Sequence, residues 1–107
     1  MKSAELTALK ETILPKLLSV GDPQKIILFG SRASQEYRVD SDVDILLIEP
    51  SSLPRYQRST RYRRALKELR LAKDIVVWTP EEINEWQHVP SAFITTIIRE
   101  GITLYEK

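Results

Sequence analysis

The sequence contains no cysteine, three glycines and a single histidine among its 107 residues. Without cysteine the chain has neither a disulfide scaffold nor a thiolate metal site, and one histidine cannot supply a paired-histidine site. No apolar run approaches the roughly 18 residues that a membrane-spanning helix needs, and the N-terminus carries no signal-like pattern. We therefore expect a cytoplasmic protein that does not enter the membrane.

The charge of the chain is nearly balanced, since 16 basic and 15 acidic residues leave a formal net charge of +1. Such a balance argues neither for nor against nucleic acid as a partner, and we expect no direct binding to nucleic acid. Apolar residues make up 42% of the sequence, which is enough for the core of one small domain. We expect residues 1–107 to form a single domain, too short to hold a second domain for an acceptor substrate.

The most informative stretch begins with two apolar runs, residues 26–29 and 45–48, which read as buried strands. Gly30 and Ser31 halt the first run at a sharp turn, here called the Gly-Ser corner. Ser31 is expected to cap a short helical turn over residues 32–36, whose free backbone N–H groups would face a ligand beyond the corner. An anion is the natural ligand for such a turn.

Two aspartates, Asp42 and Asp44, stand at the start of the second apolar run. In an extended chain, residues two apart point to the same side, with Cα atoms about 6.5 Å apart. Two carboxylates held so close repel each other, and a hard cation such as Mg²⁺ relieves that repulsion. The pair therefore predicts a magnesium site, completed by phosphate oxygens at the Gly-Ser corner.

A third aspartate, Asp74, opens a third apolar run over residues 75–78. For the Gly-Ser corner to meet Asp42, the first two strands must be antiparallel neighbours. For Asp74 to join them, the third strand must run parallel to the second, with residues 55–71 as a helical crossover. The resulting sheet is mixed. The alternative for Asp74 is a surface ion pair with Lys73 or Arg70.

Helices are expected around these strands. Residues 3–19 carry a leucine-rich stripe at helical spacing, with Pro15 expected to kink the helix or to start a second one. Thr79 and Pro80 begin a helix that runs to about residue 87, and residues 90–100 form another before an edge strand at 102–105. That last helix is expected to turn four apolar side chains inward, namely Phe93, Ile94, Ile97 and Ile98.

The helix expected over residues 55–71 has an apolar face and a strongly basic remainder. Its inward residues are Tyr62, Ala65, Leu66 and Leu69. Its basic side chains form either a solvated face or, if the helix borders the Gly-Ser corner, a set of phosphate clamps. They are Arg55, Arg58, Arg61, Arg63, Arg64, Lys67 and Arg70.

Together these residues resemble the DNA polymerase β-like nucleotidyltransferase superfamily, whose signature is Gly-Ser followed by Asp-x-Asp at the start of a strand. The likeness is greatest to the minimal nucleotidyltransferase (MNT) branch. It extends to the leading helix, to the run of residues 73–82 with its Thr79-Pro80 helix start, and to the tail over residues 99–106. The resemblance covers nearly the whole chain and implies a small mixed α/β sheet flanked by helices.

The resemblance also implies an activity. Asp42, Asp44 and Asp74 would be the catalytic and metal-binding residues, with Mg²⁺ as the cofactor. Gly30, Ser31 and Arg32 would bind the nucleotide. Domains of this branch are typically antitoxins paired with a HEPN-type ribonuclease toxin, and some transfer AMP from ATP to a tyrosine of that toxin. Exposed side chains of the C-terminal helix region, Phe93 and Tyr105 among them, would then contribute to the partner surface.

One departure from the family pattern keeps a second function open. Family members commonly continue Gly-Ser-x-Ala-Arg-Gly, whereas here Ala33 is followed by Ser34 and Gln35. The departure suits an antitoxin that neutralises its partner by binding alone. The three aspartates oppose that reading, because a relic site has no physical reason to keep three mutually repelling carboxylates together. A nucleotidyltransferase that acts on a small-molecule acceptor is a further alternative.

Overall fold

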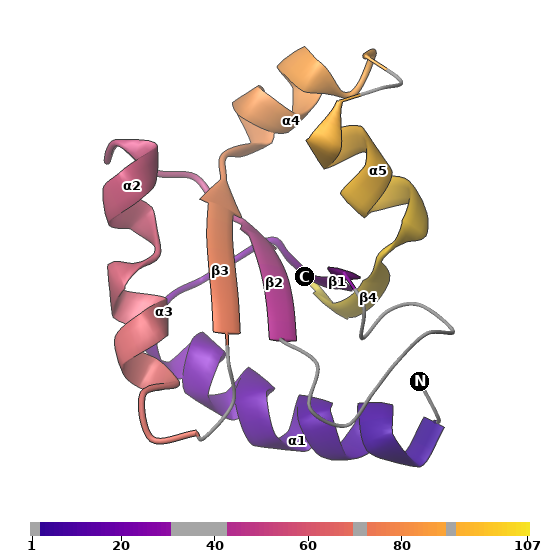
Figure 1. Ribbon diagram of the computed structural model, residues 1–107. Helices are drawn as coiled ribbons and strands as arrows, with labels where there is room; N and C mark the ends of the chain where they lie inside the picture. The colour runs from indigo at the N-terminus through magenta and orange to yellow at the C-terminus, as the bar shows by residue number, and fades with distance from the viewer. Residues whose placement is uncertain (1–2, 31–42, 70–72, 90–91) are drawn as a thin grey trace.

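The computed structural model describes residues 3–30, 43–69, 73–89 and 92–107 (Figure 1). Three of the predicted site residues, Ser31, Arg32 and Asp42, lie outside the described residues, as does the helical turn expected after the Gly-Ser corner. Gly30, Asp44 and Asp74 lie within them.

The centre of the fold is a four-stranded sheet in the order β3-β2-β1-β4. Its strands are β1 (Lys25–Phe29), β2 (Val43–Ile48), β3 (Lys73–Trp78) and β4 (Ile102–Glu106). Strand β1 pairs antiparallel with both β2 and β4, while β2 and β3 run parallel. The mixed sheet, its strand directions and the edge position of the last strand are confirmed.

One face of the sheet packs against α1 (Ser3–Val20) and α3 (Thr60–Ala65). Side chains of α1 and α3 meet alternate residues of the strands in a buried cluster, which also includes Leu66 directly after α3. The helix residues include Leu9, Ile13, Leu17 and Tyr62. Period-two alternation explains this arrangement, since every second residue of a strand points to the same face. Tyr62 and Leu66 are fully buried there, as their spacing predicts.

The opposite face packs against α4 (Pro80–Trp86) and α5 (Phe93–Glu100), which lie together on one side of the sheet in Figure 1. Ile83, Ile94 and Ile97 of these helices form a second buried cluster with strand residues such as Phe29 and Leu46. The predicted start of α4 is confirmed, because Thr79 and Glu82 form a reciprocal capping box.

The helix expected over residues 55–71 is shorter than predicted and divided. It comprises α2 (Arg55–Arg58) and α3, with the break at Ser59. Ser59 and Thr60 have low helix propensity, because their hydroxyl groups compete for backbone partners. Beyond Ala65 the chain continues in tighter turns, with Lys67 N–H donating to Arg64 O at 3.2 Å.

The predicted first helix is confirmed, whereas the last helix differs in part from its prediction. Helix α1 continues through Pro15 as one element, so no second helix begins there. Helix α5 begins at Phe93, and only Ile94 and Ile97 of its predicted inward stripe are buried. Phe93 and Ile98 are exposed, because this two-turn helix directs a narrow apolar stripe at the sheet. Among the described residues, no helix combines the length and apolarity needed to span a bilayer.

Candidate functional site

Gly30 ends β1 with a positive backbone φ of 78°, a conformation that residues with a side chain rarely adopt. A second constraint comes from its neighbour on β2. A Cβ atom at position 30 would overlap the Asp44 carboxylate, with Oδ2 as the nearest atom. Glycine is therefore required here both for the turn and for the space that the Asp44 carboxylate occupies.

The two described aspartates of the predicted site lie side by side. Asp44 on β2 is the register partner of Asp74 on β3, and on its other side Asp44 pairs with Phe29 at the end of β1. Neighbouring strands are about 4.8 Å apart, and residues directly opposite each other point to the same face. Asp44 and Asp74 share the face that carries Leu46 and Val76, which is the face covered by α4 and α5. The sheet therefore brings Gly30, Asp44 and Asp74 to one end of three adjacent strands.

The metal-binding role of these residues stays a prediction. Within the described ranges, no group of three or more carboxylate, histidine or cysteine side chains forms a metal cluster. Asp42, the third predicted ligand, lies outside those ranges. His88, the only histidine, is exposed on the loop after α4.

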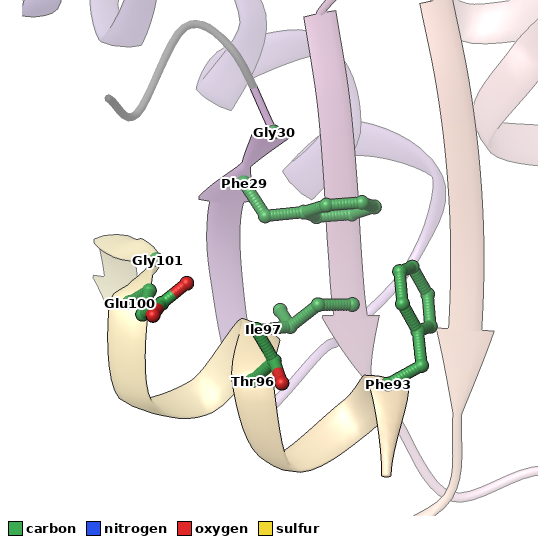
Figure 2. Close-up of a pocket in the computed structure, with 7 residues that line it drawn as sticks. All are labelled: Phe29, Gly30, Phe93, Thr96, Ile97, Glu100 and Gly101. Carbon is green, nitrogen blue, oxygen red and sulfur yellow. The ribbon is translucent and has the colours of Figure 1, made fainter. Parts of the chain in front are cut away.

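A pocket of about 370 Å³ opens directly beside Gly30, between the end of β1 and helix α5. Figure 2 shows its lining, which is Phe29, Gly30, Phe93, Thr96, Ile97, Glu100 and Gly101. The Phe29 and Phe93 rings meet edge to face, with centroids 5.8 Å apart and planes at 84°. Sequence reasoning did not detect this pocket, because its aromatic residues are far apart in the chain and no local pattern joins them.

The two arginines of α2, Arg55 and Arg58, form ion pairs with Glu82 of α4. Arg58 donates to the Glu82 carboxylate at 2.6 Å, and Arg55 donates to the same carboxylate at 3.0 Å. Both contacts lie at the opposite end of β3 from Asp74. Partial burial of Glu82 opposes its ionisation, but hydrogen bonds from Thr79 N–H, Arg58 and Arg55 outweigh it and lower the Glu82 pKa to about 2. For these arginines the structural role is favoured over phosphate binding.

A second ion pair at that end of the sheet was also missed by sequence reasoning. Glu49, which follows β2, is 5% exposed and accepts hydrogen bonds from Arg61 at 2.5 Å and from Asp22 N–H at 3.0 Å. The Tyr62 hydroxyl is buried beside it, and burial together with the nearby Glu49 carboxylate raises the Tyr62 pKa. This cluster joins α3 to the loop before β1. Glu49 follows Asp44 by five residues along the chain, a distance of about 16 Å in an extended strand.

Residues 11–107 match the family described as "Polymerase beta, Nucleotidyltransferase". The chain belongs to this family. The match spans β1, β2 and β3, so it contains both the Gly-Ser corner and the three aspartates. No curated protein sequence matches the chain significantly.

Solved structures of the same fold include a protein of Sulfolobus solfataricus provisionally assigned as a nucleotidyltransferase. The two sequences are 20% identical, with 95% of this chain and 80% of that chain covered and a TM-score of 0.64. A toxin-antitoxin complex with AMP-PNP is also 20% identical, with coverages of 92% and 73% and a TM-score of 0.64. An MNT antitoxin in complex with the tri-AMPylated HEPN toxin of Shewanella oneidensis is 19% identical, with coverages of 95% and 73% and a TM-score of 0.60. These similarities confirm the nucleotidyltransferase fold predicted from the sequence.

Proposed function

We propose that this chain is an MNT-type antitoxin that transfers AMP from ATP to a tyrosine hydroxyl of a HEPN-type partner, in a reaction that depends on Mg²⁺. The single observation that carries the proposal is the placement of Gly30, Asp44 and Asp74 at the same end of three adjacent strands. Family membership supports nucleotidyl transfer, and the antitoxin complexes among the similar structures support the choice of partner.

The residues present suit a hard cation. Asp44 and Asp74 offer carboxylate oxygens on one face, which is the donor type that Mg²⁺ prefers. Asp42, two residues before Asp44, would add a third carboxylate. Bound there, Mg²⁺ would neutralise charge on the nucleotide phosphates and stabilise the charge that develops during transfer.

Residues of the chain at this end of the three strands would bind the phosphates and accept the proton. Asp74 on β3 would take the proton of the acceptor hydroxyl, whose oxygen forms a new bond to the α-phosphorus. The bond from that phosphorus to the pyrophosphate leaving group breaks. Gly30, Ser31 and Arg32, at the end of β1, would hold the β- and γ-phosphates. Asp44 is on β2, which lies between β1 and β3. The acceptor hydroxyl would therefore attack on the β3 side of Asp44, and pyrophosphate would leave on the β1 side.

A protein acceptor suits the exposed apolar surface of α4 and α5, which reaches the site at Phe93. Large apolar side chains of α4, α5 and the loop between them are exposed, namely Trp86, Val89, Phe93 and Ile98. Phe93 is 62% exposed and also lines the pocket beside Gly30. Tyr105 is partly buried against the first core cluster, so it contributes less to a partner surface than expected from the sequence. Binding energy from such a surface would orient the acceptor hydroxyl at the nucleotide.

The direct test combines the purified protein, a candidate HEPN partner encoded beside it, ATP and Mg²⁺, followed by intact mass measurement of the partner. The expected result is a mass increase of one or more AMP groups that disappears with Asp42→Asn or Asp44→Asn. Stable complex formation without a mass increase would favour an antitoxin that acts by binding alone. A preparation that neither binds nor modifies the partner would contradict both functions.

A further inference from the structure

The pocket beside Gly30 differs in character from a phosphate site. Among the described residues that line it, none is lysine or arginine, and its one charged side chain is the carboxylate of Glu100. An exposed salt bridge joins this carboxylate to Arg99 of the same helix at 3.6 Å, and the described lining offers a triphosphate no cationic side chain. Because Gly30 belongs both to the pocket and to the Gly-Ser corner, a group bound in the pocket could be continuous with phosphates bound at the corner.

The apolar part of the pocket suits a flat ring. Phe93 stands largely exposed on α5 and is held on one side by its edge-to-face contact with Phe29. In Figure 2 the two rings and the Ile97 side chain surround the same space. A fixed aromatic ring with a free surface stacks readily on a nucleobase. The volume of about 370 Å³ lies within the range of small-molecule sites.

The polar groups at the rim are acceptors. The Glu100 carboxylate can only accept hydrogen bonds when it is ionised. The Thr96 hydroxyl donates its proton to Ala92 O at 3.4 Å, so its remaining capacity is also that of an acceptor. A complementary ligand would therefore present hydrogen-bond donors at the edge of its ring, as the exocyclic amino group of adenine does.

We propose that this pocket binds the nucleobase of the nucleotide, with Phe93 as the stacking surface and Glu100 as the group that selects a base bearing an exocyclic amine. The inference rests on the proposed function, because it takes the ligand of the Gly-Ser corner to be a nucleotide. It assigns a new role to α5, whose residues the sequence marks only as core or partner surface.

The test uses AMP and purine riboside 5′-monophosphate, which carries hydrogen in place of the 6-amino group, both without Mg²⁺. Binding is followed through the methyl NMR signals of Ile97 and Thr96. We expect AMP to shift both signals and to bind about three-fold to ten-fold more tightly than the analogue. Phe93→Ala should weaken AMP binding about five-fold or more. Glu100→Ala should remove the preference for AMP over the analogue.

Matched controls are Tyr56→Ala, which removes an exposed aromatic ring from α2, and Glu106→Ala, which removes an exposed carboxylate from β4. Neither should change AMP binding. Wild-type signals of Ile97 and Thr96 that do not respond to AMP, or unchanged affinity in Phe93→Ala, would overturn the pocket assignment. A response to a tyrosine-containing peptide in place of AMP would assign the pocket to the acceptor and overturn it as well.

The two proposals can fail separately. If Mg²⁺-ATP binds by calorimetry and requires Asp44 while the pocket signals stay unmoved, the nucleobase assignment is wrong and the proposed function stands. If AMP binds the pocket as described but no partner gains AMP in the presence of ATP and Mg²⁺, the nucleobase assignment stands and the proposed transfer is wrong.

Discussion

The carboxylate of Asp44 occupies the space that a Cβ atom of residue 30 would need. Gly30 thus has two separate constraints, its positive φ and its contact with a predicted metal ligand. The pair links the end of β1 to the start of β2, so the turn that would hold phosphates and the carboxylate that would hold the metal are fixed relative to each other. A substitution at Gly30 should therefore displace the Asp44 carboxylate.

Gly30→Ala tests this coupling. The added methyl group must displace the Asp44 carboxylate, and the positive φ costs a residue with a side chain about 1–2 kcal/mol. We expect a folded protein, destabilised by about that amount, whose Mg²⁺-dependent binding of ATP is largely lost. Urea denaturation measures the stability and calorimetry measures the binding. Gly21→Ala is the matched control, since its Cβ would meet the Tyr62 hydroxyl at the other end of the sheet. It should lose stability but keep ATP binding, and equal binding losses in both variants would contradict the coupling.

Asp44 and Asp74 are register partners, but we expect substitutions at the two positions to have different effects. Asp44 should be needed for ATP binding and Asp74 for AMP transfer. Asp44→Asn should abolish Mg²⁺-dependent ATP binding, since Asp44 adjoins the phosphate corner. Asp74→Asn should reduce AMP transfer to the partner by about 100-fold or more, because it removes the proposed proton acceptor, and should weaken ATP binding much less. Calorimetry and the time course of partner mass provide the two measurements. Equal effects of both variants on ATP binding would show that Asp74 has no separate role.

Glu82 should make the stability of the fold sensitive to acid. The pKa of Glu82 is about 2, below its ordinary value of 4.5. Its contribution to the free energy of unfolding is therefore complete above about pH 4.5 and is lost as the pH falls towards 2. Because the Glu82 side chain is 22% exposed, we expect a loss of about 1–2 kcal/mol, smaller than the full shift would give. Chemical denaturation at several pH values measures it. Glu82→Gln should lack this part of the pH dependence, whereas Glu81→Gln, in the same helical turn but exposed, should retain it.

Much of the site could be predicted from the sequence because its parts are joined by strand geometry. Short apolar runs mark the strands, and the requirement that the Gly-Ser corner, Asp44 and Asp74 meet determines which strands are parallel. The register of Asp44 with Asp74 follows from the position of each aspartate at the start of its strand. These inferences need only the period of a strand and the direction of a crossover.

The pocket and the ion pairs could not be predicted, because they depend on contacts between residues far apart in the chain. Phe29 and Phe93 meet only because α5 packs against β1, and the sequence of α5 alone predicted Phe93 to be buried. The length of the basic helix was also overestimated, since its break at Ser59 depends on weak local preferences that an arginine-rich pattern obscures. The arginine-rich pattern also did not decide whether these arginines form a solvated face or bind phosphate.

Arg58→Ala tests the purpose of that basic face. The Arg58 side chain is only 10% exposed and donates to Glu82 at 2.6 Å and to Leu53 O at 2.9 Å. Its removal leaves the partly buried Glu82 carboxylate without its shortest hydrogen bond from an arginine. We expect a decrease of about 2 kcal/mol in the free energy of unfolding with unchanged affinity for Mg²⁺-ATP. Arg64→Ala is the control, because Arg64 is exposed and forms no salt bridge within the described part of the chain. It should change stability by less than about 0.5 kcal/mol. A clear loss of ATP affinity in Arg58→Ala at full stability would instead identify this face as a phosphate site.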